Sequence, residues 1–401
     1  MAISTPALVN PSLLVWAREQ SGYEAEPVAT RLSVKVERFL SWERGDRQPT
    51  VRQVEALARF YHRPFGLFFL PQPPELPPLS AEYRRLPGVR PGVESPELRL
   101  ALRTLSLRRE TASELAEELG TSLPSFQLTA HPGEDPNVAG ARIRSALGVS
   151  IEEQLAWKDE WQAWSRWRDA VESIGALVFQ FPKVPLTEVR GVSLFVFPTP
   201  AIGVNSKESA PGARIFTLAH ELVHLALAAA REERPALHET RKASDWAQLE
   251  RFAEEAASAV IIPRETLSTK LRGLSVARDG WTLDQVRSLA RGFKVTPLAM
   301  ATRLRAEGQL TWGGYERWRR AWEKFVESLP PRSSGFATPI AKTLGRAGRP
   351  LVQLVLEAMD ANRITAAQAS RVLDLRFDHF ERLRSELHDR NIARFDTDFD
   401  G

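Results

Sequence analysis

Cysteine is absent from the 401 residues of this sequence. Its absence excludes disulfide bonds, thiolate metal ligands and cysteine nucleophiles, and it fits a reducing compartment such as the cytoplasm. Any metal site must therefore be built from histidine, aspartate or glutamate. Histidine is itself scarce, with 7 residues in the chain, so two histidines at ligand spacing are informative.

Long hydrophobic runs are also missing. No stretch reaches the roughly 18 consecutive apolar residues of a membrane-spanning helix, so we expect no contact with a membrane. Residues 1–10 lack the basic start and the apolar core of a signal peptide, and we expect a cytoplasmic protein. The chain is 43% hydrophobic and 26% charged, which is typical of folded soluble proteins with two or three domains.

Strand signals are confined to one region. Residues 176–181, 191–197 and 201–205 are short apolar segments rich in β-branched or aromatic side chains, and glycine, proline or serine bounds them. They predict three strands of a small sheet. The remaining apolar patterns are helical, so the expected fold class is mainly α with a small β-sheet, an α+β protein.

Residues 11–63 predict four short helices. Gly22 follows the first, Gly45 ends the third, and Thr50 has the side chain to cap the fourth. The segment from Ser41 to Thr50 resembles the helix end and turn of the Xre/Cro-type helix-turn-helix family, whose third helix enters the DNA major groove. That resemblance implies base or phosphate contacts by residues of the third helix, namely Lys35, Val36, Glu37, Arg38, Ser41 and Arg44.

The charge of this N-terminal segment leaves its role open. Residues 11–63 contain 9 basic and 7 acidic side chains, a small surplus for a partner whose affinity depends on phosphate neutralisation. Double-stranded DNA is one expected partner. The other interpretation is a helix-turn-helix that serves protein contacts or homodimerisation.

The strongest chemical signal is His220-Glu221-Leu222-Val223-His224, within an uninterrupted helical pattern from Arg214 to Ala228. Residues four apart lie on one face of a helix, so His220 and His224 can both direct an imidazole nitrogen at one ion. Glu221 lies one step around the helix, where it can hydrogen-bond a water at that ion.

A tetrahedral site needs a third protein ligand. The segment 250–257, a second helical pattern that ends before Pro263, supplies the preferred candidate, Glu250. Glu254, four residues later, is then expected to orient a metal-bound histidine through its second ring nitrogen. Glu254 as the ligand and His238 as the ligand are the two alternatives.

These residues predict the hydrolysis of a peptide bond. Glu221 would act as the general base and then pass its proton to the leaving amine. The ligand set suits Zn²⁺ and also Mn²⁺. Arg214 and His238 are candidates for a second oxyanion donor. The alternative function is a DNA-binding regulator or antitoxin whose metal domain senses or scaffolds without proteolysis.

The segments 201–205, 214–225 and 250–263 together resemble the ImmA/IrrE family of metallopeptidases. That family has a strand ending in asparagine, an Arg-x-Phe-Thr-x-Ala-His-Glu-Leu-x-His helix, and a Glu-x-x-Ala helix ending before proline. Residues 284–304 match the helical turn that follows this domain. Family members fused to an Xre module also carry a proline-rich spacer followed by the pattern found here as Tyr83-Arg84-Arg85-Leu86-Pro87.

The resemblance covers residues 8–86 and about 170–310. It implies zinc-dependent proteolysis of a regulatory protein, a repressor or an antitoxin, in a response to stress or DNA damage. The expected organisation is an Xre-type domain over residues 1–70, a proline-rich linker over 71–80, a helical region over 81–160, a zincin-like metallopeptidase domain over 161–328 and a C-terminal helical domain over 340–401.

Two further segments are candidate nucleic-acid surfaces. Residues 312–324 mix aromatic and basic side chains, a combination that suits single-stranded DNA and equally suits an amphipathic helix whose long side chains cover apolar surface. Residues 364–383 resemble a second helix-turn-helix. A third hypothesis follows, in which nucleic acid activates the peptidase.

Overall fold

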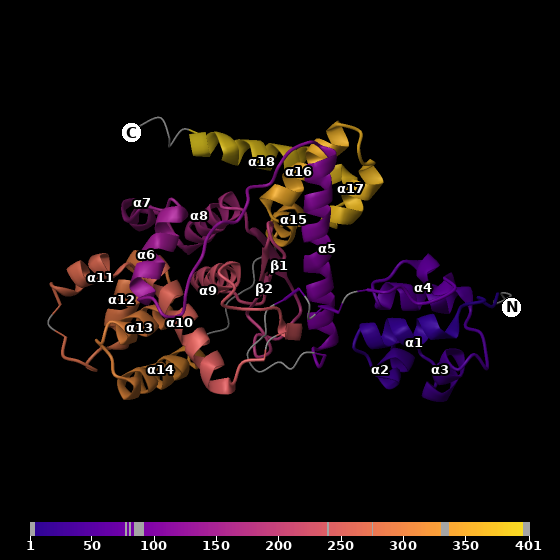
Figure 1. Ribbon diagram of the computed structural model, residues 1–401, viewed down its shortest axis with the longest axis horizontal. Helices are drawn as coiled ribbons and strands as arrows, with labels where there is room; N and C mark the ends of the chain where they lie inside the picture. The colour runs from indigo at the N-terminus through magenta and orange to yellow at the C-terminus, as the bar shows by residue number, and fades with distance from the viewer. Residues whose placement is uncertain are drawn as a thin grey trace. The chain divides into compact units, whose positions relative to one another are not determined.

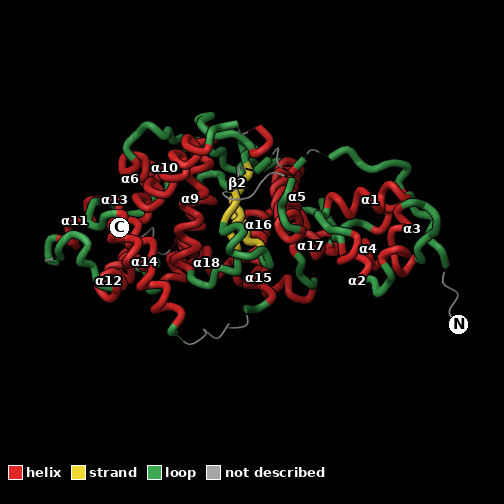
Figure 2. The backbone as a smooth tube through the Cα atoms, turned by 90° about the horizontal axis from the view of Figure 1, so that it is seen from below, coloured by secondary structure: helices red, strands yellow, loops and turns green. Residues whose placement is uncertain are grey.

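A computed structural model of the chain describes residues 5–395 apart from 77, 80–81, 84–91, 239, 275 and 330–336, and for residues 237 and 388–395 it describes the backbone alone. The chain divides into two compact units. Unit 1 comprises residues 1–81 and 87–104, and unit 2 comprises residues 82–86 and 105–401. Helices dominate, and the described strands form one small sheet, which confirms the predicted fold class (Figures 1 and 2).

Unit 1 contains the four helices predicted between residues 11 and 63. They are followed by a 3-10 turn, and a longer helix begins in this unit; the elements are α1 (Pro11–Gln20), α2 (Ala25–Arg31), α3 (Val36–Glu43), α4 (Val51–Phe60), η1 (Phe65–Phe69) and α5 (Pro96–Glu118). Phe39, Trp42 and Tyr61 are buried at the centre of the bundle. The apolar residues of these short helices are therefore spaced so that they face one shared core.

Local signals set the ends of these helices. The Thr50 hydroxyl accepts a hydrogen bond from the Gln53 amide, and the Gln53 side chain accepts one from the Thr50 amide, so a capping box begins α4. Gly45 follows α3 with a φ of +81°, a left-handed conformation that a side chain would strain. The predicted cap and the predicted stop are both confirmed.

The sheet of unit 2 contains β1 (Leu177–Phe181), β2 (Gly191–Leu194) and β3 (Ala201–Asn205) in the order β1-β3-β2. β1 runs parallel to β3, whereas β2 is antiparallel to it. All three predicted strands are present. β2 is shorter than predicted because the chain leaves the strand after Leu194 and turns before β3 begins.

Helices of unit 2 cover this sheet and carry the histidine motif. α9 (Pro211–Ala229) packs against β2, β3 and α8 (Glu160–Ser173), and α10 (Ala243–Ile261) packs against α9 and α6 (Pro136–Ala146). Gly140 permits the close approach of α6, because a Cβ there would lie 2.5 Å from the Ala259 Cβ. The core thus joins the motif helix rigidly to its neighbours.

Further helices surround this centre. They are α7 (Ile151–Ala156), α11 (Arg264–Leu271), α12 (Leu283–Phe293), α13 (Pro297–Ala306), α14 (Trp312–Glu327), α15 (Pro339–Ala347), α16 (Arg349–Asp360), α17 (Ala366–Leu373) and α18 (Phe380–Phe395), with 3-10 turns η3 (Ala236–His238) and η4 (Phe377–His379). α15 packs on β1, and the Arg168 guanidinium donates to the Leu344 and Gly345 carbonyls. The C-terminal helices are therefore part of unit 2, while the domain limits expected within that unit stay predictions.

No described helix is both long enough and apolar enough to cross a membrane.

Candidate metal centre

The motif helix α9 directs two imidazoles at one point. His220 and His224 lie one turn apart, and their Nε2 atoms are 3.1 Å from each other. His224 is fully buried, whereas 17% of the His220 side chain is exposed. The pair therefore has one face closed by the core and one face open to an approaching ligand.

Glu250 brings a carboxylate from α10 to the same point. Its Oε2 lies 3.4 Å from the His220 Nε2, and its Oε1 lies 3.6 Å from the His224 Nε2. These three residues form a group whose ligand atoms all lie within 4.8 Å of one another. Tetrahedral zinc with bonds near 2.0 Å places its ligands roughly 3.3 Å apart, so the donor set fits such an ion.

The two alternative ligands lie elsewhere among the described residues. The Glu254 Oε2 is 3.6 Å from the Arg305 Nη2, and its side chain is 39% exposed. His238 is exposed at the end of η3. Neither belongs to the group formed by His220, His224 and Glu250.

The carboxylate that orients His224 is Glu233. Its Oε2 lies 2.7 Å from the His224 Nδ1, and both side chains are fully buried. A carboxylate at Nδ1 holds the hydrogen on that nitrogen and leaves the Nε2 lone pair for a metal. The orienting role was expected of Glu254, which instead lies beside Arg305. The sequence offered one weak signal for Glu233, an acidic residue soon after the motif helix.

The path of the chain after α9 explains the position of Glu233. The helix ends at Ala229, and Arg231 has a φ of +62°, so the backbone reverses direction within a few residues. Residue 233 is thereby returned to the buried side of the motif. Two local hydrogen bonds close the turn, from the Arg231 amide to the Ala228 carbonyl and from the Glu232 amide to the Leu227 carbonyl.

Glu221 is a residue of α9 whose side chain contacts strand β2, and 2% of the residue is exposed. The Ser193 hydroxyl, on β2, donates to the Glu221 Oε2 across 2.7 Å and lies 3.1 Å from the Glu221 carbonyl oxygen. Gly191 makes room for this carboxylate, since a Cβ there would lie 2.8 Å from the Glu221 Cγ and 3.0 Å from its Oε1. The first and third residues of a predicted strand thus hold the predicted base in position.

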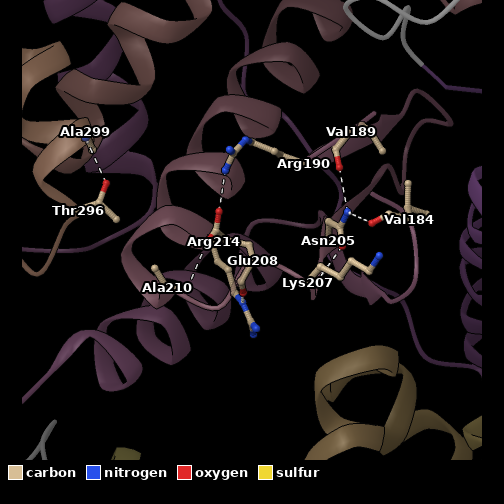
Figure 3. A network of polar contacts seen from close by, with 10 residues as sticks. All are labelled: Val184, Val189, Arg190, Asn205, Lys207, Glu208, Ala210, Arg214, Thr296 and Ala299. Atoms are coloured by element: carbon tan, nitrogen blue, oxygen red, sulfur yellow. Dashed lines mark hydrogen bonds and ion pairs between the residues drawn. The ribbon is translucent and has the colours of Figure 1, made fainter. Parts of the chain in front are cut away.

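Arg214 has a structural role rather than a place at the metal point. Its Nε donates to the Glu208 carbonyl across 2.6 Å (Figure 3). Its Nη2 donates to the Ser206 carbonyl across 3.1 Å. Burial lowers the pKa of its guanidinium. Asn205, the last residue of β3, supports the loop between β1 and β2, because its Nδ2 donates to the carbonyls of Val184 and Val189, each across 2.9 Å (Figure 3).

The candidate DNA-contact residues of unit 1 divide into two groups. Lys35, Glu37, Arg38 and Arg44 are exposed, and the Arg44 Nε donates to Asp46 across 2.8 Å. Ser41, expected on the same face, is only 8% exposed, and its hydroxyl donates to the Arg38 carbonyl across 2.6 Å. The charged candidate residues of α3 and its two ends are therefore accessible to solvent, whereas Ser41 is not.

The aromatic side chains of α14 include both buried and exposed residues. Trp318 is 5% exposed in the core of unit 2 and stacks on Trp322 at 5.9 Å between ring centroids. Trp312 is 64% exposed, and the Arg305 guanidinium lies 5.3 Å from its ring. The helix is amphipathic, and its role toward single-stranded DNA stays a prediction.

Comparison with known proteins supports the chemistry of the centre. Residues 172–305 match the family model of the IrrE N-terminal-like domain, Peptidase_M78. The matched segment begins at the end of α8, contains the sheet and both ligand-bearing helices, and ends in α13. No curated protein matches the chain. The central segment of this chain is therefore similar to a metallopeptidase domain of the IrrE/ImmA type.

Proposed function

We propose that this protein is a zinc-dependent endopeptidase that cleaves a regulatory protein, a repressor or an antitoxin, in a response to stress or DNA damage. The observation that carries the proposal is the convergence of His220, His224 and Glu250 on one point beside the buried Glu221. The match of this segment to a peptidase family supports the reaction class. The nature of the substrate and the signal rests on the resemblance to ImmA/IrrE proteins.

Each residue of the centre has a defined task in this proposal. A zinc ion held by His220, His224 and Glu250 would supply Lewis-acid polarisation of the scissile carbonyl and acidify a water molecule. Glu233 keeps the His224 ring in the tautomer that can bind it. Glu221 accepts the proton from the attacking water and delivers it to the leaving amine, while Ser193 holds its carboxylate in position.

An extended peptide can reach this centre along β2. In the described sheet β2 pairs with β3 alone, so its other side is an edge. The Asn205 amide donates to the Arg190 carbonyl, which means that residue 190 faces β3 while the alternate residues Gly191 and Ser193 turn their backbone groups outward. Such an edge binds a peptide by adding a strand.

The N-terminal unit would deliver the peptidase to DNA or to a DNA-bound partner. The exposed Lys35 and Arg38 on α3 support DNA binding, and the small net charge of residues 11–63 supports only moderate affinity. A homodimer formed through this unit is the alternative use of the same surface.

Substitution of Glu221 by glutamine tests the proposal. Zinc-loaded wild-type protein and Glu221→Gln are incubated with a library of peptides from a digested proteome, and the products are identified by mass spectrometry. We expect equal stoichiometric zinc in both proteins and a cleavage rate lowered by about 10²–10⁴ in the variant, because general acid–base catalysis contributes that much.

Two results would contradict the peptidase. One is full cleavage by Glu221→Gln, and the other is the absence of stoichiometric zinc in folded wild-type protein. Glu250→Ala serves as the complementary variant, since it should lose zinc while keeping the fold. A regulator that senses metal without proteolysis would bind zinc and cleave no peptide in any form.

A further inference from the structure

A short segment of the chain, Glu82–Tyr83, pairs with the end of strand β2; we call it the strap. The Phe195 amide donates to the Glu82 carbonyl across 2.6 Å, and Tyr83 forms an antiparallel bridge with Leu194. The strap thus lies on the outer side of the strand that carries Ser193. It occupies one end of the edge along which we expect a substrate peptide to bind.

Burial of Tyr83 and hydrogen bonds from side chain and backbone hold the strap in this place. Tyr83 is 2% exposed and is among the largest fully buried side chains of the protein. The Ser106 hydroxyl on α5 donates to the Glu82 Oε2 across 2.5 Å. The Ala236 amide donates to the Tyr83 carbonyl across 2.7 Å. The strap therefore connects the end of β2 to the loop that carries Glu233.

The strap is also joined on both sides to unit 1. Residues 1–81 and 87–104 belong to unit 1, whereas residues 82–86 belong to unit 2. The chain thus enters unit 2 at the strap and returns to unit 1 soon after it. A load on unit 1, such as binding to a large partner, would act on the strap through the covalent chain.

We propose that the strap is an intramolecular competitor of the substrate, an inference that rests on the proposed peptidase function. With the strap in place, a peptide cannot pair with the edge at Leu194 and Phe195, because Tyr83 already lies opposite Leu194 and the outward amide of Phe195 already donates to the Glu82 carbonyl. Release of the strap lengthens the free edge of β2. Long protein substrates gain more from this release than short peptides do.

The chain is suited to a reversible test because it contains no cysteine. Tyr83 and Leu194 face each other in a non-hydrogen-bonded antiparallel pair, for which the Cα atoms lie about 4.5 Å apart, inside the range that a disulfide spans. The double variant Tyr83→Cys/Leu194→Cys forms one bond that locks the strap when oxidised and frees it when reduced.

Cleavage of a long unfolded protein substrate is measured in the oxidised and the reduced double variant, with zinc content measured alongside. We expect at least a tenfold lower rate in the oxidised form and recovery with a phosphine reductant, at equal zinc content. The two single-cysteine variants, treated in the same way, should be unaffected by the reductant. Equal rates in both forms, or a faster oxidised form, would overturn the strap as a competitor.

Ser106→Ala is a gentler second variant, since it removes one hydrogen bond to the strap and no large side chain. We expect a two- to threefold faster cleavage of the long substrate and little change for a short peptide. Ser113→Ala is the matched control, because the Ser113 hydroxyl donates within α5 to the Arg109 carbonyl. An unchanged or slower Ser106→Ala protein counts against the inference.

Wild-type protein in the same assay separates the two hypotheses. If zinc-loaded wild type cleaves no substrate, the proposed peptidase function fails, together with the inference that depends on it. If wild type cleaves the substrate and the oxidised and reduced forms cleave it equally, the peptidase stands and the strap is merely structural.

Discussion

The candidate metal centre of unit 2 and the helix α3 of unit 1 use charged residues in opposite ways. At the candidate centre, Glu221 and His224 are buried, and each has a partner outside helix α9, Ser193 and Glu233 respectively. On α3, the candidate residues Lys35 and Arg38 are exposed. Catalysis of bond cleavage needs side chains that are held in one geometry within a site of low dielectric constant. Neutralising the charge of a polyanion such as DNA needs charged side chains that solvent can reach.

Unit 1 does contain a buried ion pair, but this pair supports the fold. The Arg18 guanidinium binds the Glu43 carboxylate through two contacts of 2.8 and 3.2 Å, and 5% of the Glu43 side chain is exposed. It joins α1 to the end of α3. Buried charge therefore does not by itself mark a reaction centre; the convergence of ligand atoms on one point does.

The largest effect in this comparison is expected on metal affinity, when the carboxylate that orients His224 is removed. Glu233→Ala deletes the carboxylate on the His224 Nδ1, and loss of such a partner typically costs 10–100-fold in metal affinity. Zinc affinity is measured by competition with a chelator of known strength. Glu232→Ala is the matched control, since Glu232 pairs with His131 near the surface. If the two variants bind zinc with equal affinity, the buried Glu233 does not orient His224 for a metal.

A smaller effect is expected for the exposed charges of α3. Lys35→Ala and Arg38→Ala should each lower affinity for a random-sequence 20-base-pair duplex several-fold at low salt, and each should reduce the salt slope by about one phosphate contact. Ser41→Ala should bind as the wild type does, because its hydroxyl is already bonded to the Arg38 carbonyl. Fluorescence anisotropy over a salt series measures both quantities. If the charge variants bind equally well, α3 does not contact DNA.

A third test concerns stability and a buried carboxylate away from the candidate metal centre. Burial raises the pKa of Glu172 to about 7, although Arg168 opposes the shift. The folded state thus binds this proton more tightly than the unfolded state, so the free energy of unfolding should fall as the pH rises from about 4.5 to about 7 and then level off.

Glu172→Gln tests this dependence, since glutamine does not titrate. Its free energy of unfolding should vary less between pH 5 and pH 8 and should exceed the wild-type value at pH 8 by roughly 1–3 kcal/mol. Urea unfolding at several pH values provides the measurement. Glu381→Gln, at a side chain that is 94% exposed, should change nothing. Parallel curves for Glu172→Gln and wild type would show that this buried charge does not govern stability.

Much of the fold and part of the centre could be predicted from local patterns. The four N-terminal helices, the three strands and the motif helix follow from apolar spacing, glycine stops and the Thr50 cap, all of which act within a few residues. The 3.6-residue repeat suffices to bring His220 and His224 together. Ser193 and Gly191 lay in a correctly predicted strand, but their contact with Glu221 could not be inferred, because it depends on how α9 crosses the sheet.

What the sequence determined by itself is the chemistry available: no thiol, two histidines one helical turn apart, and an acid beside them. Which acids serve which task was decided by the tertiary structure alone. Glu250 reaches both histidines and Glu233 reaches His224, whereas Glu254 lies beside Arg305. The physical reason is that a helix repeat acts over a few residues, while the packing of α9, α10 and β2 sets distances between residues far apart in the chain.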